Sequence, residues 1–425
     1  VQFNMSPETI VNEHEPASRD NVEAILNKTF KPSFEFATSA NGYYFRKDKQ
    51  GFIPEIIEKL YELRKEYKKK MIDAEKEFQK NQSQDLKEKI GQYNSMQNAL
   101  KISLNSLYGA LGNAHFRYFD VRIAEAITVS GQAVVKWTEK KTNEYLSSLL
   151  ESDKDYVIGI DTDSVFVCME DLINKYVKDQ TDTRKVIKIM DKIAEEKILP
   201  VMNEGFDELY SYLNGYKSRM VIKRESLANI GIWVAKKKYV MNVYNNEGVE
   251  YAEPKMKIKG LEIVRTSTPE MCRESIKKAV GIIFNDGEKA TQEYIKEFKE
   301  KFINSNADNV AFPRGVKELD KWVDSKGNMK SGTPIHVRGS LVFNNTVEKL
   351  GLDQKYNKIT EGEKIKYLYL KQPNPVHSNI IAFPSFFPKE FNLEEYVDYE
   401  TQFEKAFLSP IKIILDAINW EVESK

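Results

Sequence analysis

The sequence has few of the residues that build covalent or metal-held frameworks. It contains two cysteines, Cys168 and Cys272, and four histidines among 425 residues. A disulfide scaffold needs several cysteine pairs, and a structural zinc site needs four cysteine or histidine ligands close together. We therefore expect neither, and a reducing cytosol is the natural compartment for such a chain.

Long apolar runs and an excess of one charge are also missing. No stretch approaches the roughly 18 to 20 apolar residues that span a bilayer. The opening residues carry acids and prolines and do not have the form of a signal peptide, so we expect no membrane partner. The 64 Lys and Arg residues balance 64 Asp and Glu residues. With a net charge of zero, the chain must bind any polyanion through local clusters of cations.

The residues that are present predict a large packed protein of class α+β. Hydrophobic residues make up 41% and aromatic residues 11%, and the length is typical of two to four domains. Apolar residues at helical spacing before and after the polar stretch 81–85 predict two long antiparallel helices. The second helix should end near Gly109 and Gly112 with a left-handed glycine cap. Further helices are predicted near 120–150, 184–213 and 269–285, and β segments near 157–167, 220–225, 232–244, 248–261 and 364–370.

The segment 157–167 predicts a strand, a tight turn and a strand around Asp161, Thr162, Asp163 and Ser164. Two carboxylates at the tip of an apolar hairpin repel each other, and a divalent cation such as Mg²⁺ relieves that repulsion. Two other interpretations are open. Asp and Thr are ordinary residues of solvated turns, and an Asp-x-Asp pair also serves metal-dependent glycosyltransferases.

The two predicted long helices carry cations beside their apolar stripes. Lys101, Asn105 and Tyr108 stand at i, i+4 and i+7, so an ammonium, an amide and a phenol share one side of a helix. Arg64 and Lys68 repeat the i, i+4 spacing on the first helix. Such cations suit a triphosphate, although a solvated basic face would look the same.

Basic residues also cluster beside aromatic residues in the predicted strands. One cluster is Lys236, Lys237, Lys238 and Tyr239, and another is Lys255, Lys257 and Lys259 near Tyr251. Lysines in strands can follow a nucleic-acid backbone. They also protect the edges of sheets against aggregation, and that alternative stays open.

Taken together, these motifs resemble those of family B DNA polymerases. The hairpin 161–164 looks like the third motif of that family, and the helix 101–109 looks like the second, in the same order along the chain. The segments 4–9, 108–113, 236–243 and 252–262 are similar to replicative polymerases of T-even-like bacteriophages. The resemblance covers nearly the whole chain. It departs from the family at Gly159 and Ile160, where the family usually has Tyr-Gly, and in the loop between the two long helices, which is shorter than in the phage relatives.

The resemblance implies a right-hand polymerase architecture with helical-hairpin fingers, an antiparallel β palm and a mixed thumb. Residues 1–53 would form the first palm segment and 54–112 the fingers. Residues 113–252 would form the palm with the catalytic hairpin, and 253–425 the thumb. The implied function is template-directed addition of deoxynucleotides to a primer 3′-hydroxyl in the cytoplasm of an infected bacterial host.

The resemblance also implies roles for particular residues. Asp161, Asp163 and Lys101 would be catalytic, with Asp163 as a principal ligand of two Mg²⁺ ions, Asp161 as its neighbour and Glu225 as an outer-shell carboxylate. The residues implied for the deoxynucleoside triphosphate and the nascent base pair are Arg64, Lys68, Lys101, Asn105 and Tyr108. The residues implied for primer-template DNA are Lys236, Lys237, Lys238, Tyr239, Lys255 and Lys257.

The first motif of the family, which supplies the other metal-binding aspartate, has no counterpart before Asn4. Two-metal catalysis needs carboxylates from more than one segment, so we expect the chain alone to be inactive. An N-terminal portion would carry that aspartate and a proofreading exonuclease, either as a separate subunit or within a longer chain. A sliding clamp is a further partner to consider, although 419–425 shows no evident clamp-binding tail.

A non-catalytic DNA-binding subunit with the polymerase fold is the alternative function. Lys101, Asp161 and Asp163 argue against it, because a scaffold has no physical need for these charges at a costly site.

Overall fold

The computed structural model describes all residues except 262, 264, 325–328 and 423–425. Position 262 of the segment 252–262 and the last residues of the tail therefore lie outside the described residues. The chain folds as two compact units. Unit 1 contains Val1–Asn229 and Asn242–Lys255, and unit 2 contains Ile230–Met241 and Met256–Lys425. Helices and small antiparallel sheets confirm the predicted α+β class.

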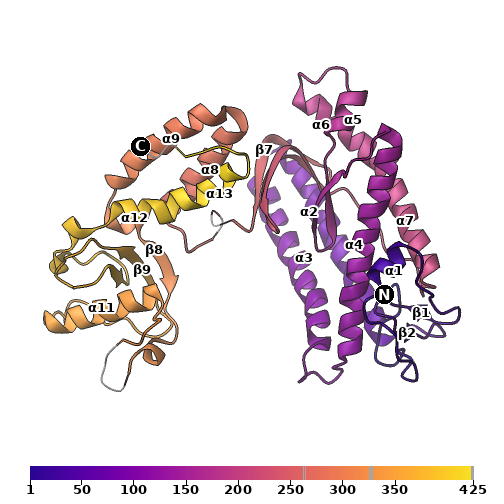
Figure 1. Cartoon of the computed structure of the whole chain (residues 1–425), viewed down its shortest axis with the longest axis horizontal. Helices are drawn as coiled ribbons and strands as arrows, with labels where there is room; N and C mark the ends of the chain where they lie inside the picture. The colour runs from indigo at the N-terminus through magenta and orange to yellow at the C-terminus, as the bar shows by residue number, and fades with distance from the viewer. Residues whose placement is uncertain (262, 264, 325–328, 423–425) are drawn as a thin grey trace. The chain divides into compact units, whose positions relative to one another are not determined.

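Unit 1 is built mainly from long helices (Figure 1). Its short antiparallel strands pair as β1 with β2 and as β3 with β4. The elements up to the end of α7 are α1 Val22–Leu26, β1 Ala37–Thr38, β2 Tyr44–Phe45, α2 Phe52–Phe78, α3 Gln84–Leu111, α4 Val121–Leu150, β3 Val157–Asp161, β4 Ser164–Val167, α5 Glu170–Tyr176, α6 Thr183–Ile193, the π-helical η1 Ala194–Ile198 and α7 Leu199–Tyr212.

The predicted pair of long helices is confirmed as α2 and α3, which lie side by side (Figure 1). Ser83 caps α3, and its hydroxyl accepts a hydrogen bond from the backbone N–H of Leu86 at 3.2 Å. The predicted left-handed glycine cap is wrong, because Gly112 has φ −87°. The backbone N–H of Asp120 instead donates to the carbonyl of Leu111 at 3.1 Å, so a returning loop satisfies the end of the helix.

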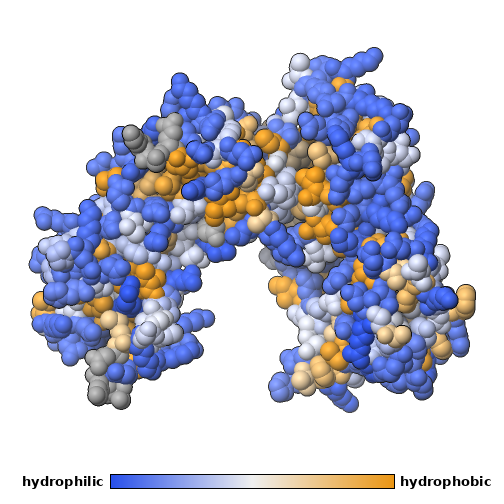
Figure 2. All heavy atoms as spheres, viewed as in Figure 1, coloured by the Kyte–Doolittle hydropathy of each residue, from blue (hydrophilic) through white to orange (hydrophobic). Residues whose placement is uncertain are grey.

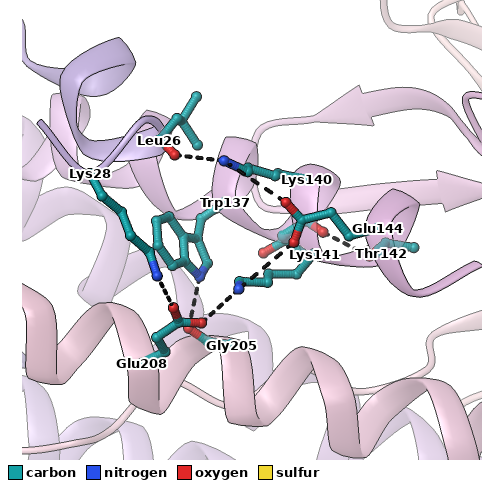
Figure 3. Close-up of polar contacts among 10 residues, drawn as sticks. Leu26, Lys28, Trp137, Lys140, Lys141, Thr142, Glu144, Gly205 and Glu208 are labelled. Atoms are coloured by element: carbon teal, nitrogen blue, oxygen red, sulfur yellow. Dashed lines mark hydrogen bonds and ion pairs between the residues drawn. The ribbon is translucent and has the colours of Figure 1, made fainter. Parts of the chain in front are cut away.

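Glu208 of α7 joins three helices of unit 1 through a polar cluster (Figure 3). Its carboxylate forms ion pairs with Lys28, which follows α1, and with Lys141 of α4. The two ammonium groups lie 5.9 and 5.3 Å from the ring centre of Trp137, which is 1% exposed. The indole Nε1 of Trp137 donates to the carbonyl of Gly205 at 2.8 Å. The cluster therefore fixes α4 against α7.

Two predictions about strands need correction. Residues 220–225 do not form a strand, because side-chain amides take up their backbone N–H groups. The N–H of Met220 donates to Gln2 Oε1 and the N–H of Ile222 donates to Asn203 Oδ1. The predicted segment 232–244 is two strands, β5 Ser226–Ala235 and β6 Lys238–Asn246, joined by a turn at Lys236 and Lys237. With β7 Val249–Lys259 they form a sheet in the order β5-β6-β7.

Unit 2 has two hydrophobic cores. One joins β5 and β6 residues to α8 and α9, and the other lies between α11 and the antiparallel sheet β10-β9-β8. The elements after β7 are α8 Glu270–Asn285, α9 Gly287–Ile303, α10 Ala307–Val310, β8 Phe312–Gly315, η3 Leu319–Trp322, α11 Ile335–Lys349, β9 Lys364–Tyr369, β10 Ile380–Phe383, η4 Lys389–Phe391, η5 Glu394–Tyr396, α12 Tyr399–Phe403, the π-helical η6 Glu404–Leu408 and α13 Ser409–Asp416.

The surface of both units is largely hydrophilic on the face shown in Figure 2. Among the described residues, no helix combines the length and the apolar character that crossing a bilayer requires.

Candidate active site and nucleic-acid interface

The turn between β3 and β4 presents two carboxylates at the tip of a hairpin. Asp161 pairs with Ser164 in the antiparallel register, and the backbone N–H of Asp163 donates to the carbonyl of Asp161 at 2.7 Å. The hydroxyl of Ser164 donates to the same carbonyl at 3.1 Å. Asp163 is exposed and Asp161 is half-buried, so solvent and ligands can reach both carboxylates.

Thr162 lies between the two aspartates with φ +61°. A β-branched residue rarely adopts this left-handed conformation, which costs about 1 to 3 kcal/mol. This conformation makes the turn tight, so Asp161 and Asp163 lie next to each other at its tip. Strain of this kind gathers where a structure must hold functional groups in a fixed geometry.

The strands below the tip form a two-stranded sheet within the described part of the chain. The register shifts between Val157 and Gly159, so Ile158 bulges out and is 48% exposed. Both outer edges of this hairpin therefore carry backbone groups without a strand partner among the described residues.

The three predicted residues of α3 lie on its surface. Lys101, Asn105 and Tyr108 are all exposed, and Tyr108 keeps 43% of its surface accessible. In the described structure the ammonium of Lys101 takes part in no hydrogen bond or ion pair. This face of α3 is therefore open to a ligand.

The two predicted cations of α2 have different surroundings. The Nε of Arg64 is buried and has no hydrogen-bond partner among the described residues. A buried guanidinium nitrogen without a partner is costly and calls for an acceptor. Lys68 is ion-paired with Glu247, which lies in the turn between β6 and β7.

The turn between β5 and β6 exposes Lys236 and Lys237. Lys237 has φ +62°, and its carbonyl oxygen lies 2.1 Å from the place where a Cβ on Gly260 would stand. Only glycine can pass the turn so closely, and Gly260 itself has φ +68°. The residue that follows β7 therefore packs directly against the lysine turn.

Tyr239 and Lys255 make intramolecular contacts. The ring of Tyr239 is 4% exposed and stacks on Trp233 with 6.0 Å between ring centres. The ring is therefore packed inside unit 2, and the contact with DNA expected for Tyr239 stays a prediction. The ammonium of Lys255 lies 4.1 Å from the ring centre of Tyr251, while Lys257 and Lys238 are half-buried in their strands.

Glu225 lies directly before β5. It is exposed, and its carbonyl accepts a hydrogen bond from the backbone N–H of Glu247 at 2.6 Å. Glu225, which the resemblance implies as an outer-shell carboxylate, is thus hydrogen-bonded to Glu247, the ion-pair partner of Lys68.

Comparison with known proteins identifies the family. The model described as DNA polymerase family B matches residues 1–418. The chain belongs to DNA polymerase family B. It is 31% identical to a DNA-directed DNA polymerase of Enterobacteria phage T4 and 32% identical to one of Escherichia phage RB69, with the whole chain covered in both comparisons. It is 26% identical to DNA polymerase 1 of Pyrococcus abyssi over 90% of its length. The resemblance inferred from the motifs is confirmed.

This family B chain spans about half the length of the curated relatives it matches. It covers 53% of the T4 protein, 52% of the RB69 protein and 41% of the Pyrococcus protein. The phage alignments run over 479 and 480 positions, more than the 425 residues here, so those relatives have insertions.

The carboxylates at the hairpin tip fit a hard divalent cation in part. Mg²⁺ prefers oxygen ligands and commonly takes one or two carboxylates together with water and substrate phosphates. Asp161 and Asp163 supply such oxygens. The described residues contain no group of three or more acidic, histidine or cysteine side chains that could hold a metal ion. A second cation would therefore need a carboxylate from another segment.

Sequence reasoning missed Glu247, although it is the partner of Lys68. Asn245, Asn246, Glu247 and Gly248 between two β runs do indicate a turn. The ion pair itself joins positions 179 residues apart, and no local pattern indicates such a contact.

Proposed function

We propose that the chain forms the fingers, part of the palm and the thumb of a template-directed DNA polymerase. In this proposal it adds deoxynucleotides to a primer 3′-hydroxyl by two-metal phosphoryl transfer. The observation that carries the proposal is the hairpin tip, where a family B chain holds Asp161 and Asp163 accessible on either side of a strained residue. The domain boundaries follow the sequence prediction, with fingers at 54–112, palm at 1–53 and 113–252, and thumb at 253–425.

Asp163 is the principal metal ligand in this mechanism, Asp161 is the neighbouring ligand and Glu225 acts from the outer shell. Bound Mg²⁺ would supply charge neutralisation for the triphosphate and acidify the primer hydroxyl. The protein holds these carboxylates in place by the short backbone hydrogen bond inside the turn.

Arg64, Lys68 and Lys101 bind the triphosphate of the incoming nucleotide. The buried Nε of Arg64, which has no acceptor among the described residues, supports this role, and so does the exposed ammonium of Lys101. A guanidinium binds phosphate oxygens as a bidentate fork, whereas an ammonium acts as a point charge. Asn105 and Tyr108 then face the nascent base pair from the exposed side of α3.

Lys236 and Lys237 contact the backbone of primer-template DNA from the β5–β6 turn, together with Lys238, Lys255 and Lys257 of β6 and β7. Phosphate contacts position a polymerase on DNA without reading sequence, which suits an enzyme that must copy any template. Tyr239 supports the turn from within the core.

The missing carboxylate implies a partner. An N-terminal portion would supply the other catalytic aspartate and a proofreading exonuclease, and it would add a strand to the two-stranded β3–β4 sheet. A sliding clamp and the cytoplasm of an infected bacterial cell complete the setting proposed from the phage relatives.

The test is primer extension with Mg²⁺ and deoxynucleotides, using this chain with and without an N-terminal polypeptide that carries the first family motif. We expect synthesis only with both parts, and none when Asp163→Asn replaces the native chain. Asp153→Asn, in the exposed loop before β3, is the matched control and should retain full activity. Robust synthesis by the isolated chain would refute the missing-carboxylate argument. DNA binding without synthesis in the complemented sample would favour the scaffold alternative.

A further inference from the structure

The second half of α2 and the residue after it contact the β6–β7 turn and the first part of β7. Lys68 forms an ion pair with Glu247, in which the two side chains are only 33% and 24% exposed. Directly after the helix, the side-chain oxygen of Gln79 accepts a hydrogen bond from the backbone N–H of Ala252 at 3.4 Å. Glu75 lies between these contacts in sequence. Burial raises its pKa, the ammonium of Lys255 opposes that rise, and the carboxylate of Glu247 adds to it. The C-terminal part of α2 is thus held against one hairpin.

Glu247 is fixed by its backbone. It has φ +51°, and its N–H donates to the carbonyl of Glu225 at 2.6 Å. The next residue, Gly248, donates its N–H to Asn245 Oδ1 at 3.1 Å. A turn held in this way presents the Glu247 carboxylate to Lys68 in a set position.

The other side of the hairpin is held by α6, without use of Glu247. The guanidinium of Arg184 donates to the carbonyl of Tyr251 at 3.0 Å, and Lys188 is ion-paired with Glu250. Removal of the Glu247 carboxylate should therefore leave the hairpin folded.

We propose that Glu247 is the resident counter-ion of Lys68 and that an incoming triphosphate must displace it. This inference rests on the proposed role of Lys68 in binding the nucleotide. A phosphate that binds the Lys68 ammonium is repelled by the Glu247 carboxylate on the same cation, so the two anions compete for it. Glu247 thereby sets nucleotide affinity, and nucleotide binding loosens α2 from the hairpin that carries Lys255 and Lys257.

The experiment is a titration of this chain into a fluorescent 2′-deoxynucleoside triphosphate, mant-dATP, in buffer with Mg²⁺. Equilibrium binding is the readout, so activity of the complete enzyme is not required. Glu247→Gln removes the charge and keeps the shape and the backbone conformation. We expect it to lower Kd by roughly two- to fivefold, the factor that a partly exposed ion pair is worth. Lys68→Ala should raise Kd.

The control variant is Glu250→Gln, which removes the same charge from the same hairpin. The native Glu250 pairs with Lys188 and not with Lys68. It should leave Kd unchanged. In a Lys68→Ala background, Glu247→Gln should also have no effect, since the cation for which it competes is gone. A gain in affinity that persists there, or equals that of Glu250→Gln, would mean a general charge effect and would overturn the proposal.

The remaining outcomes separate this inference from the proposed function. If Lys68→Ala weakens binding while Glu247→Gln does not strengthen it, the counter-ion role is wrong and the nucleotide role of Lys68 stands. If Lys68→Ala leaves Kd unchanged, Lys68 does not bind the nucleotide. Both the nucleotide role of Lys68 and the counter-ion role of Glu247 are then wrong. A far-ultraviolet circular dichroism spectrum and a melting curve for each variant show that the fold is kept.

Discussion

Gly260 gives a sharp test of how the lysine turn is supported. An alanine there would place its Cβ 2.1 Å from the carbonyl oxygen of Lys237 and would have to keep φ near +68°. Both effects are unfavourable, and they can be separated. Gly362 has φ +84° with nothing within 4 Å of the added Cβ, so Gly362→Ala measures the backbone effect by itself.

The expected magnitudes follow from these two effects. The left-handed conformation costs a residue with a Cβ about 1 to 2 kcal/mol, which is the whole effect expected for Gly362→Ala. Overpacking against a backbone carbonyl adds roughly 1 to 3 kcal/mol, because the turn must move to relieve the overlap. Gly260→Ala should therefore lower the free energy of unfolding of unit 2 by about 2 to 5 kcal/mol.

The assay compares the two variants in urea unfolding, followed by tryptophan fluorescence, and in duplex DNA binding at fixed salt. Both glycines belong to unit 2, so the same transition reports on both. Gly260→Ala should also weaken DNA binding, because it displaces Lys237, whereas Gly362→Ala should not. Equal decreases in stability, together with unchanged DNA affinity for Gly260→Ala, would refute the reasoning.

Three further predictions concern charges. Replacing Lys236 and Lys237 with alanine should reduce the slope of log Kd for duplex DNA against log salt by about one unit for each phosphate that is no longer neutralised. Lys154→Ala, at a lysine paired with Asp171, should leave this slope unchanged. Lys101→Ala should weaken mant-dATP binding by roughly tenfold or more, since it removes a charge-assisted hydrogen bond to phosphate, and an unchanged Kd would exclude Lys101 from the site. Hydrogen bonds from Lys141 and Lys28 lower the pKa of Glu208 below its ordinary value of 4.5, so its carboxylate adds stability above that pH and loses it as the pH falls through the lowered pKa. Glu208→Gln should therefore cost about 0.5 to 1 kcal/mol at pH 7 and progressively less in acid, and a cost that does not vary with pH would contradict this assignment.

The sequence predicted elements whose causes are local. The α2 and α3 helices follow from apolar spacing and from the cap at Ser83, and the hairpin tip follows from Asp161, Thr162 and Asp163 between two β-branched runs. Each of these signals lies within a few residues of the structure it produces.

The errors arose where distant groups compete for the backbone. Residues 220–225 have the composition of a strand, but Gln2 and Asn203 capture N–H groups there. Gly112 stands where a left-handed cap would be expected, but Asp120 returns to bind the carbonyl of Leu111. The approach of Gly260 to Lys237 likewise depends on the pairing of β7, which single-sequence patterns do not specify.

The assignment of Ile230–Met241 to unit 2 affects how this protein can be divided. Ile232 and Val240 belong to the same hydrophobic core as Cys272 and Ile276 of α8, although unit 1 supplies the chain before and after them. A fragment ending near residue 252 would leave those two side chains exposed, and a fragment beginning there would lack part of its interior. A chimaera that joins two family B chains at a single point near residue 252 should therefore be insoluble. A chimaera that takes 230–241 from the same parent as the C-terminal part keeps the core intact.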